Sequence, residues 1–399
     1  MIQTTRRAVI VGAAALPLRA RAQTAPVKVG VLLPTSGVLA ASGQSSLRGI
    51  RYAETILRER GGPAMTIVVA DTESKPENGR IGAERLIGEG CSVLIGAWDS
   101  GATISAAQAA ETARVPIVVN VSSARQITEQ GFTQLFRNFP PADVLIGQAV
   151  ERIKALVTGR SPAPQTAVML YVNDLYGQSL LAGVDKLWEK LEVPIRIVDR
   201  IGYDVRARDL SVEVAKARSS GADLLMPVTR VNDAILIVRE LVKQNWSPMA
   251  IIAPSGPGPY ETAFTKAVGK YGDDYMDCVP WYNPKDKQSM ELVNRFEREN
   301  PEQRFELNVG FSYEALQVVA DAITRAGSPD PVAIHAALRT TNIAEHPMYG
   351  GPIQFDAKGQ NNNIGGVMLQ NRNGAPVVVA PADVAMAEVH FPMTPFKDR

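Results

Sequence analysis

Short apolar segments alternate with longer amphipathic segments along most of the chain. Runs rich in β-branched residues predict buried strands at residues 27–33, 66–70, 93–95 and 116–121. Between these runs, apolar residues recur every three or four positions, which predicts helices. Regular alternation of strand and helix predicts parallel strands, right-handed crossovers and a sheet covered on both faces.

The same alternation begins again after Pro140 and Pro141. Helices are predicted at residues 144–156, 175–191, 209–217 and 234–243. Strands are predicted at residues 166–172, 195–201, 224–228 and 249–253. Two such runs of similar build predict an α/β protein with two lobes, each a doubly wound parallel sheet.

The remainder of the chain departs from this alternation. Beyond residues 275–282, the pattern predicts helices at 287–300, 311–325 and 331–338, then extended segments at 352–355 and 366–369. This tail is too short for a third domain, so we expect it to return to both lobes and form a multi-strand hinge. The expected lobe one comprises residues 27–143 with about 283–345, and lobe two comprises 144–282 with about 346–385.

The first 22 residues have the pattern of a cleaved signal peptide. Arg6 and Arg7 precede an apolar run over residues 8–18, and Ala20-Arg21-Ala22 forms a small-x-small cleavage site before Gln23. The apolar run is shorter than the roughly 20 residues that a membrane-spanning helix needs. We expect export to the periplasm, and the paired arginines favour the twin-arginine route over an ordinary secretory signal.

Composition narrows the classes of partner. Of the 399 residues, 45% are hydrophobic and 21% charged, which suits a globular protein with a full core. The net charge of +1 provides no electrostatic reason to expect nucleic acid as a partner, or an anionic membrane surface. Cys91 and Cys278 are too far apart in sequence to establish a disulfide, and buried free thiols are the simpler interpretation.

Catalytic motifs are not found in the sequence. His335, His346 and His390 are the only histidines, and all lie in the C-terminal part, away from the loops expected to bind ligand. Neither a zinc-protease, a phosphate-binding nor a nucleophile-elbow motif occurs. We therefore expect a binding protein without a metal or cofactor, and not an enzyme.

Ligands of open parallel sheets bind beyond the carboxyl ends of the strands, where helix N-termini present unpaired N–H groups. A cleft between two such edges suits a small anionic group. The candidate ligand-binding residues all lie in these strand-to-helix loops: Trp98, Ser100, Val121, Ser122, Ser123, Tyr176, Arg230 and Ser255. Six of them have a structural alternative: Ser100, Ser122 and Ser123 as helix caps, Trp98 and Tyr176 as packing residues, and Arg230 as a surface residue.

Several segments resemble the leucine/isoleucine/valine-binding proteins, in order and over nearly all of the mature chain. These segments are Val27 to Gly37, Ala70 to Thr72, Leu94 to Ala97, Val115 to Val118, Asn173 to Gly177 and Gly351 to Gly359. The resemblance implies a type I periplasmic binding protein fold with three hinge crossovers. It also implies a monomer that binds a small-molecule ligand and docks on the permease and ATPase subunits of an ABC importer.

The resemblance assigns roles within the expected cleft. It implies that Ser100 holds a ligand carboxylate with help from residues 121–123, and that Tyr176 closes over the ligand from lobe two. The family position that offers an acidic side chain to a ligand ammonium aligns with Ser255, and an aromatic position aligns near Arg230. Either Asp99, Asp174 or Asp233 substitutes for that acid, or Arg230 faces a second acidic group or a plain carboxylate.

The sequence therefore leaves the ligand open between an amino acid and another small carboxylate or amide, on which Trp98 can stack. The expected function is the substrate-binding component of a branched-chain-amino-acid-type ABC importer that works by hinge closure. The alternative is a periplasmic ligand sensor of the same fold that passes its closed state to a receptor.

Overall fold

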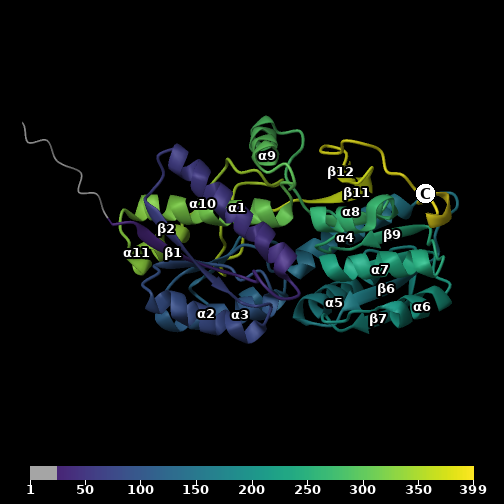
Figure 1. Cartoon of the computed structure of the whole chain (residues 1–399), viewed down its shortest axis with the longest axis horizontal. Helices are drawn as coiled ribbons and strands as arrows, with labels where there is room; N and C mark the ends of the chain where they lie inside the picture. Colours follow the sequence, from purple (N-terminus) through teal and green to yellow (C-terminus); the bar gives the residue numbers. More distant parts are fainter. Residues whose placement is uncertain (1–24) are drawn as a thin grey trace, which may run out of the picture.

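The computed structural model describes residues 25–399, so the predicted signal peptide lies outside the described residues. Two α/β lobes lie side by side along the long axis of the molecule (Figure 1). Lobe one is built on a five-stranded sheet of order β2-β1-β3-β4-β5. Lobe two is built on a seven-stranded sheet of order β12-β11-β10-β9-β8-β6-β7. The predicted α/β class with a doubly wound sheet in each lobe is confirmed.

All five strands of lobe one are parallel. They are β1 (Val27–Leu33), β2 (Met65–Asp71), β3 (Val93–Ile95), β4 (Ile117–Val119) and β5 (Leu135–Arg137). One face of the sheet is covered by α1 and α10, which pack together, and the other by α2 and α3. These helices, with α9 and α11, are α1 (Ala40–Glu59), α2 (Pro76–Gly88), α3 (Ser100–Ala113), α9 (Lys287–Glu299), α10 (Leu307–Ala326) and α11 (Pro331–Leu338).

Lobe two begins with five parallel strands and ends with two antiparallel ones. They are β6 (Thr166–Val172), β7 (Arg196–Tyr203), β8 (Leu224–Val228), β9 (Ala250–Ala253), β10 (Met276–Pro280), β11 (Gly366–Arg372) and β12 (Ala375–Ala380). Helix α4 packs on α5, and α7 packs on α6 and α8. Their bounds are α4 (Ala142–Val157), α5 (Leu175–Lys190), α6 (Ser211–Ser219), α7 (Val231–Lys243) and α8 (Thr262–Val268).

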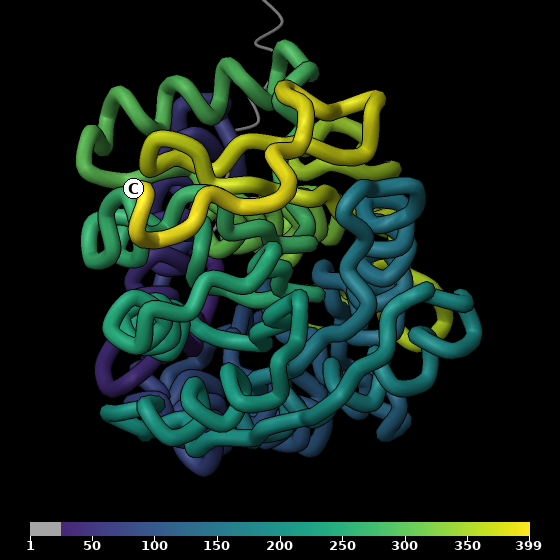
Figure 2. The backbone as a smooth tube through the Cα atoms, turned by 90° about the vertical axis from the view of Figure 1, so that its right-hand side faces the viewer, coloured from purple at the N-terminus to yellow at the C-terminus, as the bar shows by residue number. Residues whose placement is uncertain are grey.

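The chain crosses between the lobes after β5, after β10 and after α11. Isolated bridges hold these crossings side by side, including Arg137 to Gln360 and Tyr282 to Met348. In Figure 2 the C-terminal segment lies along the top of lobe two, the same side on which Figure 1 shows β11 and β12. The tail therefore contributes to both lobes, with α9, α10 and α11 in lobe one and β11 and β12 in the sheet of lobe two.

Three details of the sequence prediction were wrong. Strand β5, helix α8 and strand β12 were missed, because β5 has three residues and ends in an arginine and α8 has only seven residues. The extended segment predicted at 352–355 is not a strand, since only Ile353 pairs there, in a single bridge to Ile343. The parallel rule fails at β11 and β12, because they are joined directly, without a crossover helix, and must pair antiparallel.

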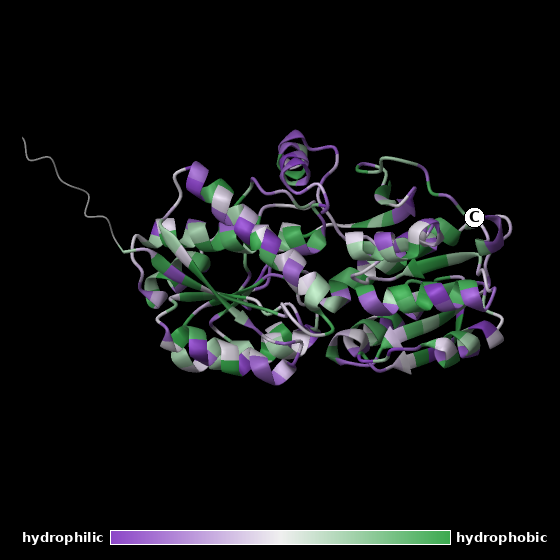
Figure 3. Cartoon of the chain, viewed as in Figure 1, coloured by the Kyte–Doolittle hydropathy of each residue, from purple (hydrophilic) through white to green (hydrophobic). Residues whose placement is uncertain are grey.

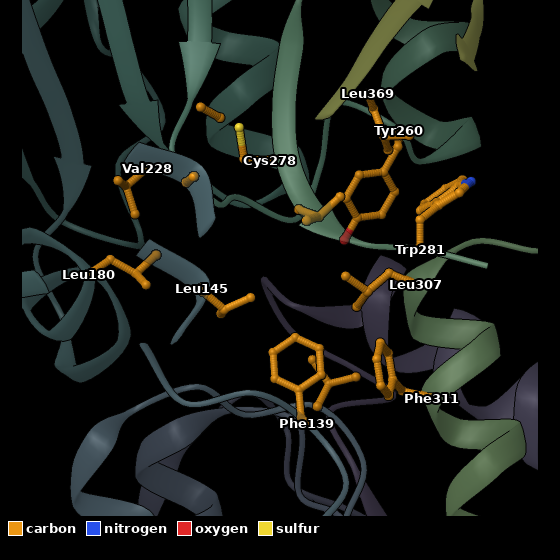
Figure 4. Packing of buried hydrophobic residues seen from close by; sticks show 14 of the residues in the cluster. Phe139, Leu145, Leu180, Val228, Tyr260, Cys278, Trp281, Leu307, Phe311 and Leu369 are labelled. Atoms are coloured by element: carbon orange, nitrogen blue, oxygen red, sulfur yellow. The ribbon is translucent and has the colours of Figure 1, made fainter. Parts of the chain in front are cut away.

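Buried apolar side chains fill the space between sheets and helices, and the hydropathy colouring of Figure 3 marks the strands as largely hydrophobic. Strand β8, for example, is buried at every position. A continuous core also runs from one lobe into the other past the crossings (Figure 4). Phe139 stacks edge-on against Phe311 with ring centroids 4.9 Å apart, and Tyr260 stacks on Trp281 at 5.2 Å.

In each lobe the parallel strands follow the order 2-1-3-4-5, counted from the first strand of that lobe. The strand order reverses between β1 and β3, and again between β6 and β8. Ligands of doubly wound sheets bind at such a reversal, beyond the carboxyl ends of the strands. Side chains from the loops after β3, β4, β6, β8 and β9 meet between the lobes.

Candidate ligand-binding cleft

A cavity with about 450 Å³ of empty space lies between the lobes. Its lining residues are Trp98, Asp99, Ser100, Val121, Ser122, Ser123, Phe139, Leu145, Tyr176, Arg230, Ser255, Pro257, Tyr260, Val279 and Leu307. All eight candidate residues are among them, from both lobes. Their role in ligand binding stays a prediction. A lining that is largely apolar with a few polar groups suits a small ligand.

The loop after β3 places the N-terminus of α3 at this cavity. Gly96 is needed for the turn, because an added Cβ would lie 2.3 Å from Leu32 O. Asp99 caps α3, and its Oδ1 accepts a hydrogen bond from Ala102 N at 3.0 Å. Ser100 is therefore the first residue of the helix and not its cap, which leaves its side chain free to face the cavity.

The three lobe-one serines of the cavity differ in the hydrogen bonds that they form within the protein. Ser122 Oγ donates to Trp98 O at 2.7 Å and contacts Thr103 Oγ1 at 2.7 Å, so this hydroxyl joins two loops. Ser100 Oγ accepts only one long hydrogen bond of 3.4 Å, from Ala124 N. Ser123 Oγ is buried and has no hydrogen-bond partner among residues 25–399. Ser100 and Ser123 thus keep hydroxyl protons available to an anion.

Arg137 lies behind the serine loop and was missed by the sequence analysis. Its side chain is fully buried, and its guanidinium donates to Ala124 O at 2.8 Å, Ser122 O at 3.3 Å and Gln360 Oε1 at 2.6 Å. Burial lowers the pKa of Arg137 to about 9, so it stays charged at neutral pH. The arginine holds the loop in place and leaves a positive charge behind the serines. The sequence signal that could have identified Arg137 as a buried functional residue is its position directly after the apolar pair Leu135 and Phe136, at the end of β5.

Arg230 is buried, so its interpretation as a surface residue is wrong. Its Nη1 lies 2.6 Å from Asp174 Oδ2, and its Nη2 lies 3.3 Å from Asp99 Oδ2. Its guanidinium also lies over the rings of Tyr176 and Trp98, with 5.1 Å and 5.9 Å to the centroids. Burial by itself would lower the pKa of Arg230. The carboxylates of Asp174 and Asp99 outweigh burial, so the pKa lies above its usual value. The pair with Asp99 joins lobe two to lobe one.

Tyrosine hydroxyls mark the lobe-two side of the cavity. Tyr176 Oη donates to Ser255 O at 3.0 Å. Tyr260 is also buried, and its hydroxyl has no hydrogen-bond partner within the described chain. Burial raises the pKa of both phenols well above its usual range, so both are neutral. Tyr260 was not among the candidate residues, because it lies five residues beyond Ser255, next to α8, a helix that was not predicted.

Two further contacts join the lobes beside the cavity. Asn232 Nδ2 donates to Val38 O at 2.8 Å, and Ser42 Oγ donates to Glu261 Oε1 at 2.9 Å. Glu261 also accepts a 3.4 Å hydrogen bond from Asn308 Nδ2, and Asn308 Oδ1 accepts from Trp98 Nε1 at 2.8 Å. Burial and the neighbouring Glu306 carboxylate raise the pKa of Glu261 to about 8. The contacts of Asn232 with Val38, and of Glu261 with Ser42 and Asn308, form only when the lobes lie together.

Other predicted features can be placed as well. Cys91 and Cys278 are both buried and free, in different lobes. Within residues 25–399, no cluster of histidine, cysteine and acidic side chains is arranged to hold a metal ion. Over the same range, no helix combines the length and apolarity that crossing a bilayer requires.

The two doubly wound lobes and the cavity between them define a two-lobed ligand-binding protein. Residues 26–374 match the family of periplasmic binding proteins. The chain belongs to this family, among the leucine/isoleucine/valine-binding proteins, as its sequence motifs predicted. Its relatives are substrate-binding proteins and not enzymes, in agreement with the prediction that it has no catalytic site.

Similar proteins span nearly the same length. Leu/Ile/Val-binding protein homolog 7 of Brucella abortus is 26% identical over 394 residues, covering 95% of this chain and 97% of the relative. LivJ of Streptococcus pneumoniae is a branched-chain amino acid transporter substrate-binding protein whose structure was solved with isoleucine. It has a TM-score of 0.77 to this chain at 19% identity, and the match covers 92% of this chain and all of LivJ. A solute-binding protein from R. palustris, solved with benzoate, has a TM-score of 0.77 at 20% identity, covering 91% and 98%.

Proposed function

We propose that this protein is the periplasmic substrate-binding component of an ABC importer and that it captures a small carboxylate-bearing molecule between its lobes. The observation that carries the proposal is the unpaired, buried Ser123 hydroxyl, which lies with Ser100 in a cavity at the N-terminus of α3. Helix N-termini favour anions. The buried charge of Arg137 adds to this preference.

In this mechanism the carboxylate docks first on lobe one, at Ser100 and Ser123. Lobe two then closes about the three crossings, and Tyr176, Arg230 and Ser255 cover the ligand. The Arg230 to Asp99 pair and the Glu261 contacts stabilise the closed form. The ligand shifts this equilibrium by its differential affinity for the closed form. We place the lobe boundaries near residues 143, 282 and 345, in or near the crossings.

The proposal extends to export and partners. The predicted signal peptide over residues 1–22, with its paired arginines, directs the chain to the periplasm. The mature monomer then delivers its ligand to permease and ATPase subunits. LivJ is a transporter substrate-binding protein, and the R. palustris protein is the solute-binding protein of an ABC transporter, which supports this role.

The test is a thermal-shift screen of the mature protein from Gln23 onward, after carried ligand has been removed by unfolding and refolding. The library contains amino acids, aliphatic and aromatic acids, and amides. A ligand at about 100 times its Kd adds roughly 2.7 kcal/mol to the stability. Small-angle scattering with the best ligand should show compaction of the molecule. If no carboxylate shifts the unfolding temperature, the proposal fails.

The serine site is tested by substitution. Ser100→Ala and Ser123→Ala should each weaken binding by at least about 1 kcal/mol, because each removes a hydrogen bond to a charged group. Ser105→Ala is the matched control, since Ser105 lies on the same helix but bonds only to Gly101 O and does not line the cavity. Unchanged affinity in both site variants would remove these serines from the site.

A further inference from the structure

The aspartates nearest the cavity already form hydrogen bonds or ion pairs within the protein. Asp99 and Asp174 each use one oxygen to cap a helix and the other to pair with Arg230. Asp233 accepts hydrogen bonds from Arg230 N at 2.9 Å and from the Tyr203 hydroxyl at 2.6 Å. Asp99 and Asp174 are therefore committed to Arg230, and Asp233, which is held through Oδ2, does not line the cavity. This arrangement does not support the hypothesis that one of the three aspartates receives a ligand ammonium.

Besides Glu261, which is held by Ser42 and Asn308 and does not line the cavity, Asp277 is the remaining acidic side chain near this end of lobe two in the described chain. Its Oδ1 accepts a hydrogen bond from Gly256 N at 3.1 Å, and Asp277 is not among the residues that line the cavity. Burial raises the pKa of this carboxyl well above its usual range, which favours its neutral form. A carboxyl that lies outside the cavity lining does not compensate the desolvation of an ammonium group buried in the cavity.

The apolar part of the cavity contains one isolated polar group. Figure 4 shows the Tyr260 hydroxyl pointing into the space between Leu145, Leu307 and Phe139. Tyr260 is 1% exposed, and none of residues 25–399 forms a hydrogen bond with its hydroxyl. Buried hydroxyl groups are normally paired, so an unpaired one that faces a ligand cavity indicates an oxygen on the ligand. The 3% exposed Ser123 hydroxyl makes the same case for the carboxylate at the serine loop.

We propose that the ligand is a carboxylic acid without an ammonium group and that it carries a second oxygen, a hydroxyl or a carbonyl, at the end that meets Tyr260. Its carboxylate binds at Ser100 and Ser123, and its apolar body packs against Phe139, Leu145 and Leu307. Tyr260 is then a specificity-determining residue. This inference rests on the proposed function and names the substrate class of that site.

The test uses acids matched in carbon skeleton, with affinities measured by isothermal titration calorimetry on refolded mature protein. The first pair is L-leucine and 4-methylpentanoate, and the second is L-phenylalanine and 3-phenylpropanoate, which differ only in the ammonium group. In each pair the ammonium-free acid should bind at least about tenfold more tightly, because no charged partner compensates a buried ammonium. Tighter or equal binding of the amino acids would overturn the inference while leaving the proposed function standing.

The second oxygen is tested with 3-(4-hydroxyphenyl)propanoate. It should bind about tenfold more tightly than 3-phenylpropanoate, and Tyr260→Phe should reduce this preference to about twofold or less. Tyr275→Phe is the matched control: Tyr275 is similarly buried but lies outside the cavity lining, and this variant should keep the full preference. A preference that is absent, or that survives Tyr260→Phe, would overturn the role of Tyr260. If no acid of either kind binds, the inference and the proposed function both fail.

Discussion

The contact between Glu261 and lobe one makes the stability of the protein depend on pH. Glu261 precedes α8 in lobe two, yet it is buried against Ser42 and Asn308 of lobe one. Burial and the nearby Glu306 carboxylate raise the pKa of Glu261 from 4.5 to about 8. The pKa of Glu306 is raised as well, and Arg48 is the charged group that opposes both shifts.

The sign and size of the effect follow from proton linkage. A raised pKa means that the folded protein holds a proton that the unfolded chain releases between pH 4.5 and about 8. The stabilisation is therefore complete below pH 4.5 and is lost as the pH rises toward 8. Over the range from pH 5 to pH 7, these two pKa values predict a loss of about 2.5 kcal/mol in the free energy of unfolding.

Glu261→Gln replaces the protonated carboxyl with a neutral side chain of the same shape. Urea unfolding followed by tryptophan fluorescence at pH 5, 6, 7 and 8 gives the stability of each form. Between pH 5 and pH 7, the free energy of unfolding of the variant should rise by about 2 kcal/mol relative to that of the wild type. Glu306 is present in both proteins and makes the stability of both depend on pH. Glu151→Gln, at an exposed position of α4, should follow the wild type at every pH.

Parallel stability curves for wild type and Glu261→Gln would refute this reasoning. They would show that Glu261 titrates as an exposed carboxyl and that lobe one does not cover it. The hydrogen bonds from Ser42 and Asn308 to Glu261 would then not form in solution, and the closed arrangement would need another explanation.

Three other substitutions or modifications have defined outcomes. Arg230→Met should lower the free energy of unfolding by about 2 kcal/mol, since it leaves two carboxylates without their cation, and a loss below about 0.5 kcal/mol would show that water screens the pairs. In thermal unfolding, Gly177→Ala should cost more than about 2 kcal/mol because its Cβ would lie 1.8 Å from Val172 O, whereas Gly88→Ala has open space and should be neutral or stabilising. Cys91 and Cys278 should resist thiol reagents until the protein is unfolded, because burial raises the pKa of both thiols; rapid labelling of the native protein would contradict their burial.

Local patterns predicted most of the fold because each apolar run had to be covered. β6, β8 and α11 begin and end at the predicted residues. The candidate loops were also found from the sequence, since the carboxyl ends of parallel strands always meet at one edge of the sheet. By contrast, α8 and β5 are too short to have a clear period of their own. They form because the neighbouring strands and helices stabilise them.

The sequence by itself determined the alternation of strands and helices, the two lobes and the loops in which Ser100, Ser123 and Arg230 lie. Only the tertiary structure decided how those side chains are used. It pairs Arg230 with Asp99 and Asp174, and it leaves the hydroxyls of Ser123 and Tyr260 unpaired. The physical reason is that a hydrogen bond or ion pair depends on distances between residues far apart in the chain, such as the 131 positions between Asp99 and Arg230. Periodicity describes neighbours along the chain, whereas the charge and polarity of a cavity depend on neighbours in space.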